Sequence, residues 1–289
     1  MTIVAGFSAS SRGRAPLNLA AQIARSTGEK LVAASIVERP WPPKDDPVER
    51  EYLAYLTGQV KRQLEEALAT LPKDLDSWPV VSESDSIPTG LTELATEVGA
   101  EAVVVGSSST GLLGRVALGG VTGRLVHTAR VPVVIAPRGY PVADGPIRRL
   151  SIAYGGQAEA VGLIAAGADL AKRWSATLRI VSFTVRPVWS VAERSAEDLV
   201  VQQWLRRTTD EITKQLDDVR SRIAVPDVDV VIGQGHDWRE AVEGVEWAPG
   251  DLFLMGSGAA GTKAQVFLGS AASKILRHTP VPVMIMPAR

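Results

Sequence analysis

The chain carries one pattern twice, at a constant offset of 150 residues. The first copy, Gly106–Pro137, reads GSSSTGLLGRVALGGVTGRLVHTARVPVVIAP, and the second, Gly256–Pro287, reads GSGAAGTKAQVFLGSAASKILRHTPVPVMIMP. Each copy follows a short apolar run, and its order is a Gly/Ser-rich loop, a helix and a buried strand after a Val-Pro step. A repeat of this size predicts two similar folding units in one chain.

Strands and helices alternate around both copies, and almost every expected strand is a short apolar run. We expect strands at Thr2–Gly6, Leu31–Val37, Pro79–Ser82, Ala102–Val105 and Pro132–Ala136, and then at Leu150–Tyr154, Thr177–Thr184, Val228–Ile232, Asp251–Met255 and Pro282–Met286. We expect helices between them, with long ones at Val48–Leu71 and Glu197–Ile223, one at Ala158–Trp174, one at Trp238–Val245, and one that ends at Val98 and is capped by Thr89 or Thr92.

This alternation predicts an α/β fold made of two tandem doubly wound domains, each a parallel sheet with helices on both faces. The predicted units are residues 1–138 and 148–289, joined by a linker at 139–147 that is rich in proline and glycine. The strand order 3-2-1-4-5 would bring the small-residue loops after strands one and four together, where ligands bind in such sheets.

Composition excludes several classes of site and partner. The net charge is −1, which offers no strong field for nucleic acid or an anionic membrane surface, and no apolar run is long enough to span a bilayer. The chain has no cysteine, so disulfides, thiolate metal sites and cysteine nucleophiles are excluded. No leader-like segment opens the sequence, and we expect a cytoplasmic protein.

The repeated loop and helix predict an anion site, because the first amides of a helix lack partners and the helix dipole is positive there. The alternative is a tight structural turn. Gly256–Gly261 fits G-x-G-x-x-G, but it follows the fourth strand, and no acid ends the next strand, so a dinucleotide fingerprint is rejected. Thr262-Lys263 reverses the order that a P-loop requires.

No set of catalytic residues is evident. His127 and His278 are expected in the last turn of a helix, and His236-Asp237 is expected to cap one. No serine has a histidine and an acid at a defensible spacing, and no acidic cluster has a metal-site pattern. Trp41 and Trp189 occupy equivalent loops, where they could cover a planar ligand or a protein surface. We therefore expect that the protein is not an enzyme.

Because it carries the loop–helix–Val-Pro-Val pattern twice, the chain resembles the universal stress proteins in their tandem form. The resemblance covers Ile3–Pro137 and Leu150–Pro287. The resemblance implies a five-stranded sheet per domain and pairing of the two final strands in an intramolecular pseudo-dimer. It also implies that some members bind adenine nucleotide, here ATP with or without Mg²⁺. Hydrolysis of that ATP would be slow at most. The resemblance further implies that two chains associate as a homodimer.

Nucleotide-binding members of the family carry G-2x-G-9x-G-[ST] after the fourth strand. The first copy has Gly106, Ser109, Gly119 and Gly120 at these positions, and the second has Gly256, Ala259, Gly269 and Ser270, so neither is complete. The acid expected after the first strand is replaced by Ser8 and Gly155. The binding residues that the resemblance implies are Ser8, Ile36, Gly106, Ser107, Ser109, Gly119 and Gly120, together with Phe183, Gly256, Gly258, Gly269 and Ser270.

Two hypotheses remain open. In the first, the chain is an ATP-binding sensor or regulator of a stress response, and nucleotide orders the loops that partners contact. In the second, the small-residue loops are structural turns, and the protein acts through dimerisation and binding of a protein partner. The missing acids favour the second hypothesis, and Gly119, Gly269 and Ser270 favour the first.

Overall fold

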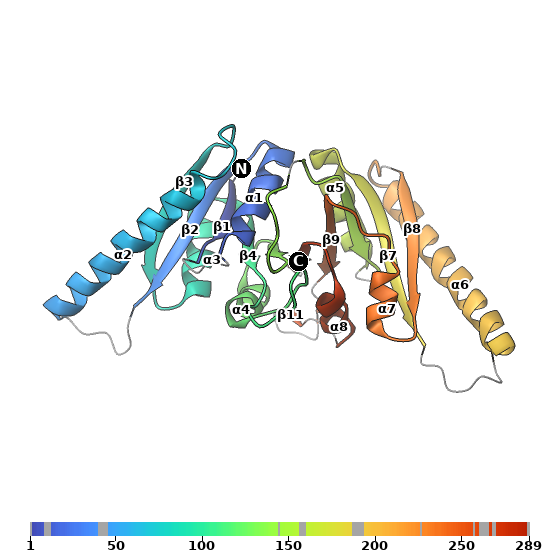
Figure 1. The fold of residues 1–289 in the computed structure, drawn as a ribbon. Coiled ribbons are helices and arrows are strands. Elements are labelled where there is room, and N and C mark those ends of the chain that lie inside the picture. Colours follow the sequence, from blue (N-terminus) through green and yellow to red (C-terminus); the bar gives the residue numbers. More distant parts are fainter. Residues whose placement is uncertain are drawn as a thin grey trace.

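The computed structural model describes residues 2–8, 13–39, 46–143, 145–155, 160–186, 194–225, 227–256, 258–259, 266–267 and 270–287. Trp41, Trp189 and Gly269 lie outside these residues. Figure 1 shows two similar halves side by side, with both chain ends drawn within the molecule.

The first half alternates strands and helices as expected. Its strands are β1 (Thr2–Gly6), β2 (Lys30–Glu38), β3 (Ser77–Ser84), β4 (Ala100–Gly106) and β5 (Val133–Ala136), and its helices are α1 (Ala15–Thr27), α2 (Pro47–Leu68), α3 (Ile87–Glu97) and α4 (Gly120–Thr128). Helix α1 ends at Gly28, whose φ of 69° lies in the left-handed region that favours glycine.

The second half repeats this order with one addition. Its elements are β6 (Arg149–Ala153), α5 (Ala160–Trp174), β7 (Thr177–Val185), α6 (Arg194–Arg220), β8 (Val228–Gly235), α7 (Trp238–Glu243), β9 (Asp251–Gly256), α8 (Ser270–His278) and β12 (Val283–Met286). A short hairpin, β10 (Gly258–Ala259) with β11 (Val266–Phe267), follows β9 and was not expected from the sequence.

The halves share one ten-stranded sheet, in the order β3-β2-β1-β4-β5-β12-β9-β6-β7-β8. Within each half the pairs are parallel and follow the expected order 3-2-1-4-5. The two final strands meet in the middle as an antiparallel pair, with Val134 opposite Met284. This pairing confirms the expected pseudo-dimer within one chain, and it covers the edges that two separate sheets would expose.

Two helical layers cover the sheet, and each continues across both halves (Figure 1). Helices α1, α2, α5 and α6 pack on one face, over a core that includes Ile3, Leu31, Ile152 and Leu254. Helices α3, α4, α7 and α8 pack on the other, over a core that includes Val103, Leu125, Phe253 and Val283. Because both apolar cores run under β5 and β12, the halves are held by shared packing as well as by hydrogen bonds.

One local expectation was wrong. Helix α3 is capped by Ser86, whose Oγ accepts a hydrogen bond from Thr89 N at 3.3 Å, so neither Thr89 nor Thr92 is the cap. Competing hydroxyls close together explain the error, since any of them can bond a free amide.

Candidate functional site

The candidate site of the first half lies where β1 and β4 end. These strands are neighbours in the sheet, with Ala5 opposite Val104, so the segments that begin at Phe7 and Ser107 leave the sheet side by side. Phe7 N donates to Ala34 O at 2.7 Å, and Ser107 N donates to Ala136 O at 2.9 Å. The strand order reverses at β1, which has β2 on one side and β4 on the other, and this reversal places both small-residue loops at one edge, as the sequence predicts.

The loop after β4 closes on itself through Ser107. Ser107 Oγ accepts from Ala117 N at 2.7 Å and donates to Ala117 O at 3.2 Å, and Ser108 N donates to the same carbonyl at 2.8 Å. A Cβ on Gly111 would sit 2.8 Å from Ala117 Cβ, so the turn needs glycine there. Both hydrogen-bonding functions of the Ser107 hydroxyl are used within the loop, and its role is to fix the loop's shape.

Helix α4 begins beside this loop without a side-chain cap. Gly119 is its N-cap residue, in an extended conformation (φ −91°, ψ −180°) that any residue can adopt. A Cβ on Gly119 would lie 3.5 Å from Ser108 Cβ, whereas a Cβ on Gly120 would have no heavy atom within 4 Å. The space over Gly120 is therefore open at the positive end of the helix dipole, which suits an anion.

Two contacts hold this helix end against the strand ends. Thr122 is 4% exposed, and its Oγ1 donates to Gly106 O at 2.9 Å. A Cβ on Gly106 would lie 3.4 Å from Pro16 Cγ, so glycine here lets the first turn of α1 approach β4. Gly106, Ser107, Gly119 and Gly120 thus lie together, as expected from the sequence.

The remaining first-half residues are more dispersed. Ser8 and Ser109 are exposed, on the loops after β1 and β4 respectively. Ile36 is buried and packs with the core beneath α3, where a Cβ on Gly90 would be 2.8 Å from Ile36 Cγ2. Its side chain therefore packs on the α3 face of the sheet, in the same apolar cluster as Val116 of the loop that Ser107 closes.

In the second half, the corresponding described residues lie on β9, the hairpin and α8. Gly256 ends β9, Gly258 opens the hairpin, and Ser270 is the exposed first residue of α8. The ring of Phe183 packs edge-on against Phe253, with centroids 6.2 Å apart, in the core on the α7 face. Gly269 lies outside the described residues, so the phosphate end of this copy stays a prediction.

Both loops after the fourth strands reach across to the other half. Arg115 of the first loop donates from Nη2 to Glu243 Oε1, on α7, at 2.6 Å. Strand β11 of the second loop lies against α4 of the first half (Figure 1). Sequence reasoning missed Arg115 and Glu243, because a single sequence carries no signal that pairs residues so far apart in the chain.

A buried charge cluster at the opposite ends of the second half's strands was also missed. Asp251 is 2% exposed and accepts from Arg149 Nε and Nη2 at 2.9 and 2.7 Å. Arg179 is also 2% exposed; its Nη2 lies 3.5 Å from Asp251 Oδ2, and its guanidinium is 5.1 Å from the Trp247 ring centre. The hydrogen bond to Asp251 raises the pKa of Arg149, and burial lowers the pKa of Arg179.

The histidines occupy structural positions. His127 and His278 lie in the last turns of α4 and α8, as expected. Asp237 caps α7 by accepting from Glu240 N at 2.8 Å, and this backbone hydrogen bond lowers the pKa of Asp237.

The described residues include no group of three or more His, Asp or Glu arranged to hold a metal ion. Of the helices described, none is long and apolar enough to cross a bilayer.

Comparison of the sequence with known proteins identifies one family. The sequence model of the Universal stress protein family matches residues 1–137 and again 146–287. Universal stress proteins of Mycobacterium bovis and Mycobacterium tuberculosis are each 31% identical over 295 aligned residues, which cover 99% of this chain and all of the relative.

Solved structures show the same fold. A protein of unknown function from Pseudomonas aeruginosa PAO1 matches with a TM-score of 0.59 at 14% identity, over 99% of this chain and 92% of its own. A universal stress protein from Archaeoglobus fulgidus matches with a TM-score of 0.59 at 16% identity, over 99% of this chain and 96% of its own.

Proposed function

Because the chain belongs to the universal stress protein family, we propose that it is a regulatory protein that binds an adenine nucleotide, ATP, in its first half. The observation that carries this proposal is the uncapped start of α4 at Gly119–Gly120, beside the carboxyl ends of β1 and β4. The bound nucleotide would act as a signal, changing the surface that partners contact.

The residues present fit the phosphate end of such a ligand. The amides that follow Gly119 would hold the phosphates, and the open space over Gly120 leaves room for them. Gly106 adds no side chain at the strand end, where Pro16 of α1 lies close, and Ser107 and Ser108 hold the loop through Ala117. These hydrogen bonds within the chain fix the shape of the loop, and a preorganised loop favours affinity.

The other end of the nucleotide would be held less strongly. Ser8 is exposed where binding relatives carry an acid, and a hydroxyl gives a neutral hydrogen bond in place of a charge-assisted one. A charged hydrogen bond contributes about 1.5–3 kcal/mol, so its loss weakens binding by roughly ten- to a hundredfold. The resemblance placed Ile36 in the adenine pocket, but its side chain packs under α3, so we assign it to the wall behind this end.

We propose the first half as the main site because the second half offers fewer groups that could bind the ligand. Gly155 stands where Ser8 stands in the first half and has no side chain to donate, and Phe183 is committed to packing on Phe253. Ser270 begins α8 and could still meet a phosphate, so a weaker second site is part of the proposal.

We propose that the protein acts by binding and not by rapid catalysis. No described side chain beside Gly119 is a candidate general base for an attacking water. Magnesium would enter as the partner of the ATP phosphates, which keep the ion bound without several protein ligands. Any hydrolysis would be slow.

One observation favours a second candidate function. Ser107 Oγ both donates and accepts a hydrogen bond within the loop, so the loop can be a structural turn whose form does not require nucleotide. Under this alternative, partner proteins bind elsewhere. Helix α2 offers one surface, since Val48, Tyr52 and Tyr55 on it are 73%, 59% and 61% exposed.

Isothermal titration of nucleotide-free protein with ATP and Mg²⁺ separates the two candidates. We expect micromolar binding to the wild type and at least a roughly hundredfold loss in Gly119→Phe, whose ring would cover the start of α4. Gly123→Ala is the matched control, because a Cβ there has no heavy atom within 4 Å. No heat at millimolar ATP from a folded wild type would overturn the nucleotide proposal and favour the partner-binding one.

A further inference from the structure

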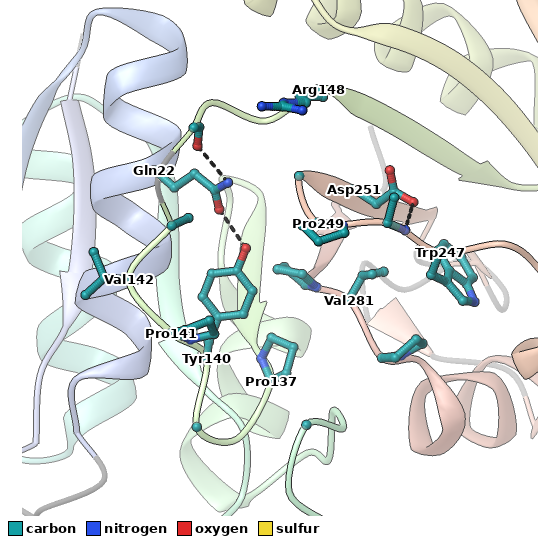
Figure 2. Close-up of a pocket in the computed structure, with 18 of the residues that line it drawn as sticks. Gln22, Pro137, Tyr140, Pro141, Val142, Arg148, Trp247, Pro249, Asp251 and Val281 are labelled. Atoms are coloured by element: carbon teal, nitrogen blue, oxygen red, sulfur yellow. Dashed lines mark hydrogen bonds between the residues drawn. The ribbon is translucent and has the colours of Figure 1, made fainter.

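A cavity of about 570 Å³ lies between the two halves, away from the start of α4. Its walls come from both halves and from the linker. Gln22, Gly114 and Arg138 line it from the first half, and Trp247 and Val281 line it from the second. Figure 2 shows Tyr140 and Pro141 on one side and Pro249, Val281 and Trp247 on the other. Ligand sites of proteins commonly measure 300–1,000 Å³ and often lie between domains, so this cavity has a suitable size and position.

Rigid residues line the cavity. Six of the chain's eighteen prolines contribute to it: Pro137, Pro141, Pro146, Pro249, Pro280 and Pro282. Proline fixes φ, so these walls change little when a molecule enters. The ring of Trp247 is held by the hydrogen bond from Nε1 to Val242 O at 2.8 Å and by Arg179 against its face.

Most polar groups of the lining are already bonded within the protein. Gln22 Nε2 donates to Gly145 O at 2.9 Å, and Gln22 Oε1 accepts from Tyr140 Oη at 2.6 Å. Asp251, the one carboxylate among the described lining residues, accepts from Arg149 and from Ala248 N. The lining therefore offers apolar surface and few free polar groups.

The exception is Arg148. It is exposed at the rim, and no described residue accepts a hydrogen bond or forms an ion pair with its guanidinium. A Cβ on Gly145 would lie 3.3 Å from Arg148 Nη2, which places the cation at the linker side of the cavity (Figure 2). Arg138 is a second lining cation, whose Nη1 donates to Gly111 O at 2.6 Å.

From these contacts we propose that the cavity between the halves binds a small aromatic molecule with one anionic group. The rings would lie among the prolines, Tyr140 and Trp247, and a carboxylate or sulfonate would pair with Arg148. The site lies apart from the one proposed for nucleotide, and it does not depend on that proposal.

The occupant would also contact a wall shared with the Gly/Ser loop. Gly114 N donates to Arg138 O at 2.9 Å, and Arg138 N donates to Arg115 O at 3.1 Å. Both Gly114 and Arg138 line the cavity, so a molecule seated there bears on the residues that support the loop after β4.

Two fluorescent probes test the proposal on the full chain. 8-Anilinonaphthalene-1-sulfonate has the proposed chemistry, and N-phenyl-1-naphthylamine has the same rings without the anion. We expect the sulfonate to bind at one site per chain, and Arg148→Gln to lower the ratio of the two affinities by about tenfold. An unchanged ratio would overturn the anionic part of the proposal.

Substitutions in the walls test the location. Ala248 is an exposed lining residue, and Ala248→Phe should weaken both probes at least about tenfold by filling the cavity. If that variant lowers the melting temperature, Val142→Phe tests the opposite wall at a position that is 57% exposed. Full binding by a folded variant at either position would place the probes elsewhere and contradict the proposal.

The matched control is Tyr52→Ser combined with Tyr55→Ser on α2, an exposed aromatic surface where such probes could also adhere. This control should bind both probes as the wild type does, and a loss of binding in it would contradict the proposal. Millimolar ATP should leave the sulfonate bound; displacement by ATP would assign the probe to the nucleotide site and overturn the cavity assignment.

Discussion

Arg115 Nη2 lies 2.6 Å from Glu243 Oε1, and this ion pair joins the Gly/Ser loop of the first half to helix α7 of the second. The loop that the site depends on is thus held from both sides of the molecule. From its own half, Arg138 bonds Gly111 and Gly114. Because the two side chains are 25% and 42% exposed, the pair contributes modestly to stability.

A double-mutant cycle tests this pair. Arg115→Gln and Glu243→Gln, alone and together, should give a coupling free energy of about 0.2–1 kcal/mol by chemical denaturation. The coupling should shrink at high salt, because partly exposed charges are screened. A coupling of zero at low salt would show that the contact contributes nothing in solution.

Restoring the missing acid should strengthen nucleotide binding. Ser8→Asp replaces a neutral hydrogen-bond partner with a charged one, at an exposed position that tolerates the change. Calorimetric titration should show about tenfold tighter ATP binding, with Ser8→Asn as the uncharged control of the same size. Equal affinities for both variants would mean that Ser8 does not contact the nucleotide.

The buried carboxylate of Asp251 should be among the most sensitive positions of the second half. Asp251→Asn removes the charge that faces Arg149 and Arg179, and should lower the free energy of unfolding by about 3–5 kcal/mol. Asp217→Asn is the control, because Asp217 is 66% exposed in its pair with Arg220. Equal losses of stability in denaturant melts of the two variants would contradict the cluster's role.

Tyr140 in the linker should make the free energy of unfolding depend on pH in the alkaline range. Burial raises the pKa of Tyr140 from 10.0 to about 12, and its hydroxyl donates to Gln22 Oε1 at 2.6 Å. Between pH 10 and 12 the unfolded state has lost this proton and the folded state retains it. The contribution of Tyr140 to the free energy of unfolding is therefore fully present below pH 10 and is lost as the pH rises toward 12.

Tyr140→Phe supplies the measurement. The difference in tyrosinate absorbance between wild type and variant should titrate near pH 12. The variant should also lose less stability than the wild type as the pH rises through this window. A difference spectrum that titrates near 10.0, the ordinary tyrosine value, would place the hydroxyl in water.

Much of the fold could be predicted because the repeat supplies its own evidence. Apolar runs of strand length followed by small-residue loops and helical stripes occur in the same order in both halves, and the strand order 3-2-1-4-5 follows the rules of parallel sheets. The N-cap residues of the helices were harder to predict. Ser86, Thr89 and Thr92 can each bond a free amide, and only the three-dimensional structure selects Ser86.

The site was predictable in its backbone and not in its side chains. Gly106, Gly119 and Gly120 could be placed because the loop and the helix start follow directly from chain order. Ile36 and Phe183 lie in the sheet, and the faces against which they pack depend on α3 and Phe253. The ion pair Arg115–Glu243 and the cavity between the halves arise from the antiparallel pairing of β5 with β12, which brings together residues more than a hundred positions apart.

Hydrogen exchange of the full chain, with and without ATP and Mg²⁺, tests the central claim most directly. If nucleotide binds at the start of α4, the amides between Gly106 and Thr128 should exchange more slowly when ATP is present, with Gly119–Gly123 protected most. The corresponding peptides of the Gly119→Phe variant should show no change. Unaltered exchange across Gly106–Thr128 at millimolar ATP, or protection confined to other parts of the chain, would contradict the account.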